Sequence, residues 1–382
     1  MDEKILDRAG KVRSGEEIDP VVLADYLSNH IPDLKGIPTI KQFKGGASNL
    51  TYRLDFDNTS LILRRPPLGT KAKSAHNMGR EFDIMKKLKP HYPSVPVTHV
   101  YCEDESLIGT DFYVMERIVG MIPRQNLPES LNFTADQVRE LCENSLDKWV
   151  ELHKIDYKKA GFEDYYRGEG YVARQVLGWN KRYRKARTPD VPECETVMAW
   201  LEKEMPGDLA PCIIHNDYRF DNMVYDPDNP TKVIGVLDWE MCTVGDPLMD
   251  VGSSLAYWIE AKDPFCLRMF RRQPTHMEGM MSRDEMVAYY LEKMGMEGRD
   301  MRFYYVFGLF RLAAIIQQIY YRYYHKQTKT KAFAVMGAAV HMMNTYCEKL
   351  IKSKSDKLSD YPLSLWDNLN FSSRTLIKKF TA

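Results

Sequence analysis

The chain has 382 residues, of which 44% are hydrophobic and 28% are charged. This balance is typical of a globular protein with a large core, and it excludes wholesale disorder. The 53 basic and 53 acidic residues give a net charge of zero at pH 7, which removes any electrostatic argument for a nucleic-acid partner.

The apolar residues and the cysteines give an expectation for the cellular compartment. No apolar run follows the charged residues at the N-terminus, so we expect no secretory signal. The most apolar stretch, residues 303–324, is interrupted by polar side chains and predicts a buried helix rather than a membrane span. The 7 cysteines lie far apart without paired spacing, which predicts reduced thiols in a cytoplasmic protein and neither a disulfide framework nor a zinc site.

The chain divides into three predicted parts. Residues 1–35 form a helical extension, because Asp19 and Pro20 are a good N-cap and first-turn pair before an apolar run. The sequence leaves open what this extension covers. Residues 36–118 are rich in strand signals, and residues 119–382 are mostly helical with one embedded hairpin.

A turn of small residues lies near the start of the second part. Residues 43–54 read as a strand, a Gly-Gly turn and a returning strand. Backbone N–H groups in such a turn, together with the side chain of Ser48 or Asn49, can cradle phosphates. A plain hairpin turn is the alternative, and this segment alone does not decide between the two.

The next strand and helix carry charged residues. Residues 61–64 are β-prone, and strand alternation places Ile62 and Arg64 on one face and Arg65 on the other. Residues 79–88 have apolar side chains at helical spacing, with Glu81 at the start of the helix. The alternative is that both arginines are solvated edge charges and that Glu81 is an exposed acid favoured by the helix dipole.

Three further segments lie between this helix and residue 213. Residues 112–118 predict a buried strand with a polar exit. A capping box at Thr134 opens a helix that carries His153 on its apolar stripe, so we predict that this histidine is a core residue. Residues 178–185 mix aromatic and basic side chains, which either meet an anionic or acyl-CoA-like acceptor or form a solvated helix face, the usual outcome for a charge run.

The most informative motif follows an apolar strand at residues 213–222. Asp217 and Asn222 are five residues apart, and the β-prone runs 223–225 and 233–237 flank a cluster of turn residues. We expect these runs to pair as a hairpin, which brings Asn222 and Asp238 side by side at its open end. Carboxylate and amide oxygens can hold magnesium, and Asp217 can accept a proton, so the segment predicts a phosphoryl-transfer centre.

Other polar residues near the motif receive structural predictions. We expect His215 to brace the loop and Asp250 to accept hydrogen bonds from loop amides. Arg219 could neutralise phosphate charge, but a surface arginine is the simpler interpretation. Asp226 and Asp228 resemble the start of a calcium loop, but the proline that follows them indicates a plain turn.

The order of His215, Asp217, Asn222 and Asp238, with the segment 245–252 after it, resembles the aminoglycoside phosphotransferase and choline kinase branch of the protein-kinase-like superfamily. The resemblance spans roughly residues 36–345 and is closest to the phosphotransferase domains found beside acyl-CoA dehydrogenases. It implies a bilobal α+β fold, with a small nucleotide-binding lobe of antiparallel sheet and helix and a larger helical lobe that holds the catalytic loop and the acceptor pocket.

The same resemblance implies a role for individual residues. The cofactors are ATP and Mg²⁺, with Asp217 as the catalytic base and Asn222 and Asp238 as metal ligands. Arg64 takes the place of a lysine that binds the nucleotide and pairs with Glu81; arginine keeps the charge but is not equivalent to lysine. The other implied nucleotide contacts are Ser48, Asn49, Ile62 and the hinge residues Met115, Glu116 and Arg117. The acceptor candidates are Arg182, Tyr257, Trp258 and Arg311, with core packing as the alternative for the last three.

We therefore predict an ATP- and Mg-dependent phosphotransferase that moves the γ-phosphate to a hydroxyl of a small molecule. A hydroxy acid or hydroxyacyl-CoA is favoured over an aminoglycoside, because the helical part has no acidic excess. A choline- or amino-alcohol-type kinase stays open, since many tyrosines are present to form an aromatic cage. The alternative from another class is a nucleotide-binding pseudokinase or interaction module, which would explain Arg64. A protein kinase is less favoured, because the sequence pattern of a protein-kinase activation segment is missing.

Overall fold

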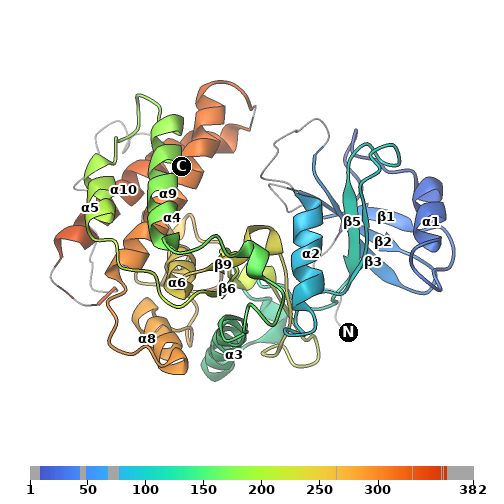
Figure 1. Ribbon diagram of the computed structural model, residues 1–382, viewed down its shortest axis with the longest axis horizontal. Coiled ribbons are helices and arrows are strands. Elements are labelled where there is room, and N and C mark those ends of the chain that lie inside the picture. Colours follow the sequence, from blue (N-terminus) through green and yellow to red (C-terminus); the bar gives the residue numbers. More distant parts are fainter. Residues whose placement is uncertain are drawn as a thin grey trace.

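The computed structural model consists of two lobes (Figure 1). A smaller lobe holds an antiparallel sheet with a helix on each side, and a larger lobe is mostly helical. The residues that the structure describes are 9–43, 49–67, 77–263, 265–328, 330–353, 355 and 357–358.

The elements follow the predicted order of strands before helices. The strands are β1 (Thr39–Gln42), β2 (Leu50–Asp55), β3 (Ser60–Arg65), β4 (Thr98–Cys102), β5 (Phe112–Glu116), β6 (Cys212–Ile214), β7 (Met223–Tyr225), β8 (Val233–Val236) and β9 (Thr243–Gly245). The α-helices are α1 (Pro20–Ser28), α2 (Met78–Leu88), α3 (Ala135–His153), α4 (Tyr171–Ala186), α5 (Glu195–Lys203), α6 (Pro247–Leu255), α7 (Phe265–Arg268), α8 (Arg283–Met294), α9 (Arg302–Tyr324) and α10 (Met336–Lys352).

The sheet of the smaller lobe has the order β1-β2-β3-β5-β4 and is antiparallel throughout. Strands β3 and β5 pair in a register that sets Ile62 opposite Met115 and Arg64 opposite Tyr113. The two central strands therefore present these residues from neighbouring positions. Of the strand, turn and returning strand predicted at 43–54, the returning strand is present as β2, while its antiparallel partner β1 ends at Gln42, one residue before the predicted start. The turn, including Ser48, lies outside the described residues.

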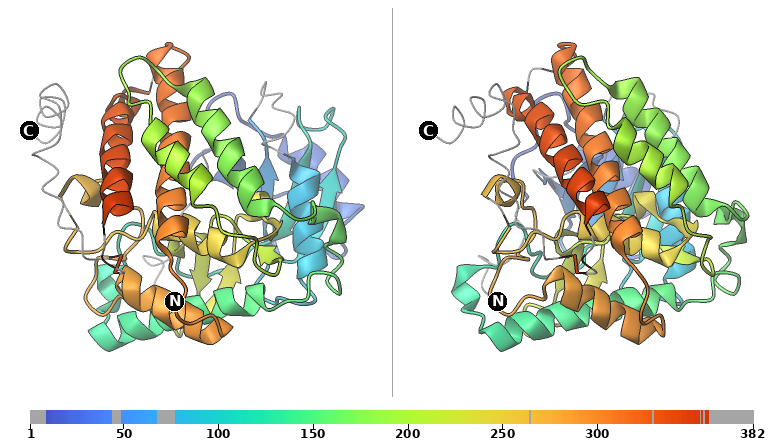
Figure 2. Two further views of the ribbon diagram at one scale, coloured as in Figure 1. Left: turned by 60° about the vertical axis from the view of Figure 1, so that its left-hand side comes forward. Right: turned by 90° about the vertical axis from the view of Figure 1, so that its left-hand side faces the viewer.

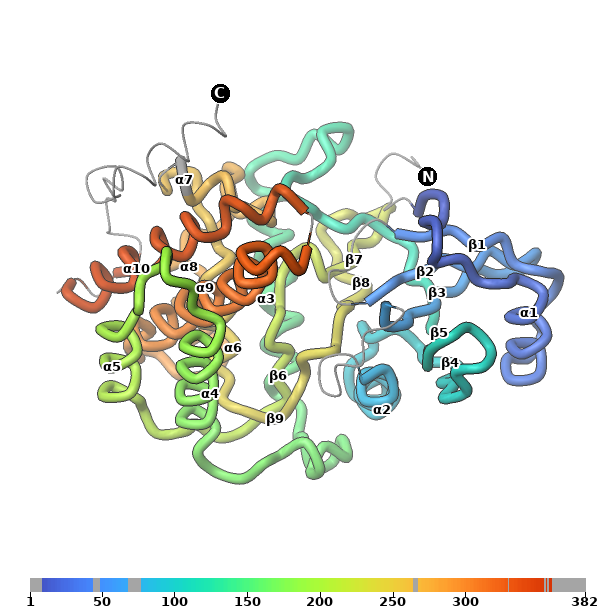
Figure 3. The backbone as a smooth tube through the Cα atoms, turned by 90° about the horizontal axis from the view of Figure 1, so that it is seen from above, coloured from blue at the N-terminus to red at the C-terminus, as the bar shows by residue number. Residues whose placement is uncertain are grey.

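Helix α1 covers the face of the sheet that points away from the larger lobe (Figures 1 and 3). Its side chains Leu23 and Leu27 are buried in one apolar cluster with Leu54 and Leu63 of the sheet. The carboxylate of Asp19 caps the helix by accepting hydrogen bonds from the first-turn N–H groups, as the cap and proline pair predicts. This packing shows what the N-terminal segment covers.

Arg65 connects the same segment to the sheet. Its side chain is 1% exposed, and it donates hydrogen bonds to the carbonyl oxygens of Glu16 and Ile108 and to the hydroxyl of Tyr52. The alternative of a solvated edge charge is therefore wrong for Arg65. A buried arginine is tolerated here because each of its nitrogens has an oxygen acceptor.

Helix α2 lies on the opposite face, between the sheet and the larger lobe (Figure 1). Asn77 caps its start, and Glu81 in its first turn is buried, so the exposed-acid alternative for Glu81 is wrong. The guanidinium of Arg80 donates hydrogen bonds to the carbonyl oxygens of Glu240 and Cys242. These bonds tie α2 directly to the larger lobe.

Helix α9 forms the centre of the larger lobe, with α4 and α10 beside it (Figure 2). It contains the apolar stretch 303–324, and the predicted buried helix is confirmed. Helices α6 and α9 cross at two glycines: a Cβ atom on Gly308 would lie 1.8 Å from the carbonyl oxygen of Gly252. Only glycine allows this approach. Within the described part of the chain, no helix has the length and apolarity needed to cross a membrane.

The predicted core histidine and the predicted hairpin are both confirmed. The capping box at Thr134 opens α3, and His153 at its other end is buried, with its ring nitrogens 2.5 Å from the Tyr290 hydroxyl and 3.1 Å from the Asp250 carboxylate. Strands β7 and β8 pair antiparallel, with Met223 opposite Val236. The cysteines whose surroundings are described are free and buried.

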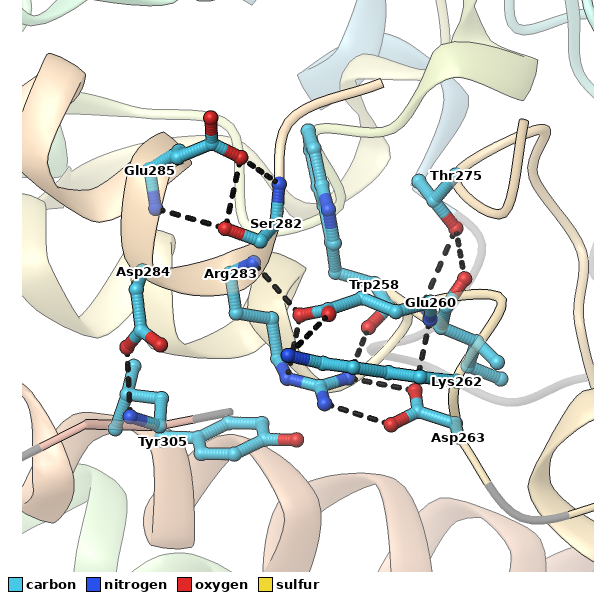
Figure 4. A network of polar contacts seen from close by, with 12 residues as sticks. Trp258, Glu260, Lys262, Asp263, Thr275, Ser282, Arg283, Asp284, Glu285 and Tyr305 are labelled. Atoms are coloured by element: carbon cyan, nitrogen blue, oxygen red, sulfur yellow. Dashed lines mark hydrogen bonds and ion pairs between the residues drawn. The ribbon is translucent and has the colours of Figure 1, made fainter. Parts of the chain in front are cut away.

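A buried ionic network fixes the segment between α6 and α8 (Figure 4). The guanidinium of Arg283, which is 3% exposed, makes two 2.7 Å hydrogen bonds to Asp263 and lies 3.3 Å from Glu260. It also donates to the carbonyl oxygen of Trp258. The network therefore holds the chain that follows α6 against the start of α8.

We expect Arg283→Met to lower the free energy of unfolding by about 3–5 kcal/mol, because it leaves Asp263 buried without its cation and leaves Glu260 with Lys262 alone. Arg139→Met is the matched control: Arg139 pairs with Glu285 at 2.9 Å on the surface, and its loss should cost under about 1 kcal/mol. Urea unfolding of both variants measures the difference. Equal losses in the two variants would contradict the structural role of the buried network.

Candidate active site

A cavity between the two lobes brings together most of the predicted nucleotide and metal residues. It encloses about 1030 Å³ of space, open solvent included. The smaller lobe and the connection contribute Thr51, Ile62, Arg64 and residues 115–120, and the larger lobe contributes Asp221, Asn222, Leu237 and Asp238. Arg64 and Asp238, which are 174 positions apart in the sequence, thus lie side by side in the wall of this cavity.

Arg64 joins three elements at this wall. One guanidinium nitrogen donates to Glu81 of α2 at 2.5 Å, and another donates to Asp238 at 3.2 Å. Arg64 is 8% exposed, so the alternative of a solvated edge charge is wrong for it as well. Burial alone would lower the pKa of Arg64, but the negative groups around it, Glu81 foremost, together outweigh burial and leave the pKa well above its usual value.

The loop of residues 215–222, which carries the expected base Asp217 and is called the catalytic loop below, is held by the buried carboxylate of Asp250. Its two oxygens accept hydrogen bonds from the N–H groups of His215 at 3.0 Å and Asn216 at 2.7 Å. The same carboxylate accepts from the indole N–H of Trp149 and contacts His153. Burial opposes ionisation of Asp250, but its surrounding donors, the hydrogen bond from His153 foremost, together leave its pKa below the usual value. The predicted structural role of Asp250 is confirmed.

His215 and Asn222 fix the two sides of Asp217. The imidazole of His215 lies 3.0 Å from the Leu237 carbonyl oxygen and accepts the N–H of Asp217 at 3.3 Å, so the predicted bracing role is confirmed. The side-chain amide of Asn222 donates to the Asp217 backbone carbonyl at 2.9 Å and to its carboxylate at 3.1 Å. Because the nitrogen of Asn222 is engaged in this way, its oxygen is the atom left for a cation.

Arg219 belongs to the site, and the prediction of a surface arginine is wrong. Its guanidinium lies 3.1 Å from the Asp217 carboxylate and 3.3 Å from that of Asp221. It also stacks on the Tyr257 ring, with its central carbon 4.6 Å from the ring centroid. The only indication in the sequence that Arg219 belongs to the site was its position two residues after Asp217. Its inward orientation follows from the conformation of the loop, which brings its guanidinium to Asp217 and Asp221.

Glu240 is a further site residue that the sequence reasoning missed. Its carboxylate accepts a hydrogen bond from the side chain of Asn49 at 2.9 Å and lies 3.9 Å from Arg64. Burial, followed by the negative charge of Asp238, raises the pKa of Glu240 to about 8. The signal was its position two residues after Asp238. Through this contact, Asn49 connects the small-residue turn to the larger lobe.

The metal candidates lie at the ends of the hairpin, as its pairing predicts. The N–H of Leu237 donates to the Asn222 carbonyl at 2.8 Å, which places Asp238 beside Asn222. Asp238 has a left-handed backbone, with φ of 68°. This conformation is uncommon for a residue other than glycine, and such strain is often found at functional sites. Asp226 accepts the N–H of Asp228 in the turn at the other end, where a plain turn is confirmed.

The hinge residues Met115, Glu116 and Arg117 line the cavity. The N–H of Glu116 donates to the carbonyl oxygen of Val97 at 2.7 Å, and the Glu116 carboxylate accepts the N–H of Val97 at 2.9 Å. The N–H group of Glu116 is therefore engaged within the smaller lobe. This N–H group, one of the hinge groups expected to bind an adenine, therefore already donates its hydrogen bond to Val97.

The acceptor candidates occupy different surroundings. Trp258 is 3% exposed and donates its indole N–H to the Met281 carbonyl, so it packs in the core. Tyr257 faces Arg219, while Arg182 is exposed and stacks on Trp179 at 4.6 Å. Arg311 is 5% exposed and donates to the Asn216 carbonyl at 3.0 Å. Tyr257 and Arg311 are thus the candidates that the structure places beside the catalytic loop.

Comparison with known proteins agrees with this geometry. A model of the phosphotransferase enzyme family (APH) matches residues 39–284. Acyl-CoA dehydrogenase family member 10 of Mus musculus is 37% identical over 306 residues, which cover 78% of this chain and 28% of that protein. The chain spans less than half the length of the curated relatives that it matches.

Two solved structures show the same fold. One, from Ralstonia eutropha JMP134 and assigned to the aminoglycoside phosphotransferases, is 28% identical with a TM-score of 0.74, covering 88% of this chain and 99% of that one. Choline kinase from Cryptosporidium parvum is 13% identical with a TM-score of 0.60, covering 87% of this chain and 96% of that one, and supports the fold alone. The predicted bilobal α+β fold is therefore confirmed, and the chain belongs to the phosphotransferase enzyme family (APH).

Proposed function

We propose that the protein transfers the γ-phosphate of ATP to a hydroxyl group of a small molecule. The observation that carries the proposal is the shared cavity wall of Arg64, Asn222 and Asp238, with the Asp217 carboxylate hydrogen-bonded to Asn222. In the reaction, the acceptor oxygen forms a bond to the γ-phosphorus while the bond to the β,γ-bridging oxygen breaks. ADP leaves, and Asp217 takes the proton of the hydroxyl.

The residues at the hinge-side wall fit a nucleotide. Ile62 and Met115 lie opposite each other on β3 and β5 and offer apolar contact for a base. The engaged N–H of Glu116 moves the expected backbone contact with adenine to the residues that follow it. Arg64 would bind the phosphates, with Glu81 holding its guanidinium in place. Asn49 and Ser48 would contact the phosphates from the small-residue turn.

Asn222 and Asp238 would hold a magnesium ion. The free oxygen of Asn222 and the Asp238 carboxylate are hard ligands of the kind that magnesium prefers, and few protein ligands suffice when phosphate oxygens complete the shell. The ion would neutralise charge on the phosphates. In the present arrangement Asp238 is paired with Arg64 instead, so Arg64 is free to turn to phosphate when Asp238 takes a cation.

For the acceptor, a hydroxy acid or hydroxyacyl compound is favoured. The longer relative that matches this chain is named as an acyl-CoA dehydrogenase family member, which agrees with an acyl-type acceptor. A choline- or amino-alcohol-type acceptor is the second candidate. The buried free cysteines are suited to a reducing compartment, and we place the protein in the cytoplasm on that ground.

A nucleotide-binding pseudokinase is the alternative function. The salt bridge from Arg219 to Asp217 favours it, because it engages the carboxylate that an acceptor hydroxyl would have to reach. The two functions differ in one measurable property: the pseudokinase binds MgATP without transferring phosphate to any acceptor.

The first test is phosphate transfer from ATP and magnesium to a panel of hydroxy acids, hydroxyacyl-CoAs, amino alcohols and aminoglycosides. We expect turnover with at least one class, and Asp217→Asn should lower it about a hundredfold to ten-thousandfold while MgATP binding is kept. Asp228→Asn, an exposed aspartate on the same hairpin, is the control and should act as wild type. Binding of MgATP without turnover would indicate the pseudokinase, and absence of binding would exclude both functions.

A second test concerns Arg64. Arg64→Met should lower turnover by at least about a hundredfold, because the positive charge at the phosphates is lost. Arg64→Lys keeps the charge but cannot bridge Glu81 and Asp238 at once, so we expect a smaller loss that shows mainly as a higher KM for ATP. Arg53→Met on the neighbouring strand is the control. Steady-state kinetics with ATP as the varied substrate decide, and unchanged kinetics in Arg64→Met would leave the arginine with a structural role alone.

A third test concerns the metal ligands. Magnesium should strengthen ATP binding in the wild-type protein, and Asp238→Asn should reduce this gain by about tenfold. ATP affinity without magnesium should not fall and should rise, because the substitution removes a negative charge that repels the phosphates. Calorimetric titration with ATP, with and without magnesium, measures both quantities. If the variant gains as much from magnesium as the wild type, Asp238 is not a ligand.

A further inference from the structure

Arg311 is a buried cation whose charge is not balanced by any acid of the described chain. Its residue is 5% exposed, and no carboxylate among the described residues lies within ion-pair distance of it. Its one hydrogen bond runs from a terminal guanidinium nitrogen to the Asn216 carbonyl oxygen at 3.0 Å. The other two nitrogens have no hydrogen-bond acceptor within the described residues.

The other buried arginines show how unusual this is. Arg64 pairs with Glu81 and Asp238, Arg219 with Asp217 and Asp221, and Arg283 with Asp263 and Glu260. Arg65 has no carboxylate either, but its three nitrogens all donate to oxygen atoms. A buried charge is costly unless it is paired and hydrogen-bonded, and Arg311 is the one member of this set with neither a carboxylate partner nor acceptors for all three nitrogens.

The surroundings of Arg311 orient it toward the reaction centre. Asn216, whose carbonyl it contacts, directly precedes Asp217, so the guanidinium lies one residue from the catalytic base. The guanidinium also lies over the Trp179 ring, with its central carbon 5.5 Å from the ring centroid, and Arg182 lies over the same ring at 4.6 Å. The unpaired nitrogens are not among the buried, unsatisfied atoms of the described residues, which means that solvent can reach them.

We propose that Arg311 binds a carboxylate or phosphate group of the acceptor, whose hydroxyl then reaches Asp217. This subsite deepens the proposed function and rests on it, because it assigns a charge to the acceptor. The incoming anion would supply the two missing hydrogen bonds and the missing counter-charge together. Arg182, which is exposed and lies over the same tryptophan ring, would add a second cation.

The same geometry selects against cationic acceptors. An aminoglycoside or a quaternary ammonium group placed on Asp217 would lie close to an unpaired guanidinium in a partly dry site, where like charges repel strongly. A negative acceptor is attracted by the same charge. The subsite therefore distinguishes a hydroxy acid or hydroxy phosphate from an amino alcohol.

A purely structural role for Arg311 makes a different prediction. Its bond to the Asn216 carbonyl supports a residue with φ of 64°, but Asn216 is already held by Asp250 and by a 3.0 Å bond from its side chain to the Met241 carbonyl. If support were the only role, removal of Arg311 would affect charged and neutral acceptors equally. The ratio between the two is thus the informative quantity.

The experiment uses matched pairs of probes: 2-, 3- and 4-hydroxybutyrate with their amides, and glycerol 3-phosphate with glycerol. We expect the wild-type protein to prefer the anion of at least one pair by about tenfold to a hundredfold in kcat/KM, and Arg311→Met to remove the preference. Arg311→Lys should restore part of it. Arg322→Met, an exposed arginine three turns along α9, is the control and should keep the wild-type ratio. The two kinds of pair show whether the anion is a carboxylate or a phosphate.

Binding of the same probes to the nucleotide-free protein, measured by calorimetry, separates the subsite from the proposed function. Anion binding that Arg311→Met abolishes supports the subsite even where no phosphate is transferred. Equal treatment of anion and neutral partner by the wild-type protein, or a loss in Arg311→Met that is the same for both partners, overturns it. If Arg311→Met does not fold, the wild-type ratio and Arg311→Lys decide.

Discussion

The buried carboxylate of Asp250 is the interaction on which the catalytic loop depends. Two backbone N–H groups, an indole N–H and an imidazole converge on its two oxygens, so one charge on α6 joins α3 to the loop. A buried acid is stable only when its acceptor capacity is used, and here at least four donors or partners use it. Because the N–H groups belong to His215 and Asn216, the direction of the chain into Asp217 follows from this contact rather than from any property of Asp217 itself.

A second set of contacts places the smaller lobe on that loop. Arg64 reaches Glu81 and Asp238 together, and Arg80 reaches two carbonyl oxygens of the segment after Asp238. Helix α2 is thus bonded to both lobes, and its position sets the distance between β3, which carries Arg64, and the metal candidates. The arginine in place of lysine is suited to this task, since its planar fork can hold two carboxylates at once.

The parts of the site that the sequence predicts are those set by short-range geometry. The hairpin that joins Asn222 to Asp238 follows from turn residues between two β-prone runs, and strand alternation separates Arg64 from Arg65. The contact of Asn49 with Glu240, which spans 191 positions, depends on how the lobes close and has no local signal. The burial of Arg219 could not be predicted either, because a single charged residue on a loop gives no indication of which way the loop turns.

The glycine crossing of α6 and α9 has a consequence for substrate length. Helix α6 carries Asp250, which fixes the loop of the base, and α9 carries Arg311 one turn beyond Gly308. Backbone packs against backbone at Gly252 and Gly308, so at this crossing no side chain lies between the two helices that could repack. The proposed base, Asp217, and the unpaired cation, Arg311, are therefore both held by one rigid pair of helices. In the proposed reaction, an acceptor bound by both residues must have a length, in bonds between its hydroxyl and its anionic group, that fits the fixed distance between them. Motion of the smaller lobe does not change this distance.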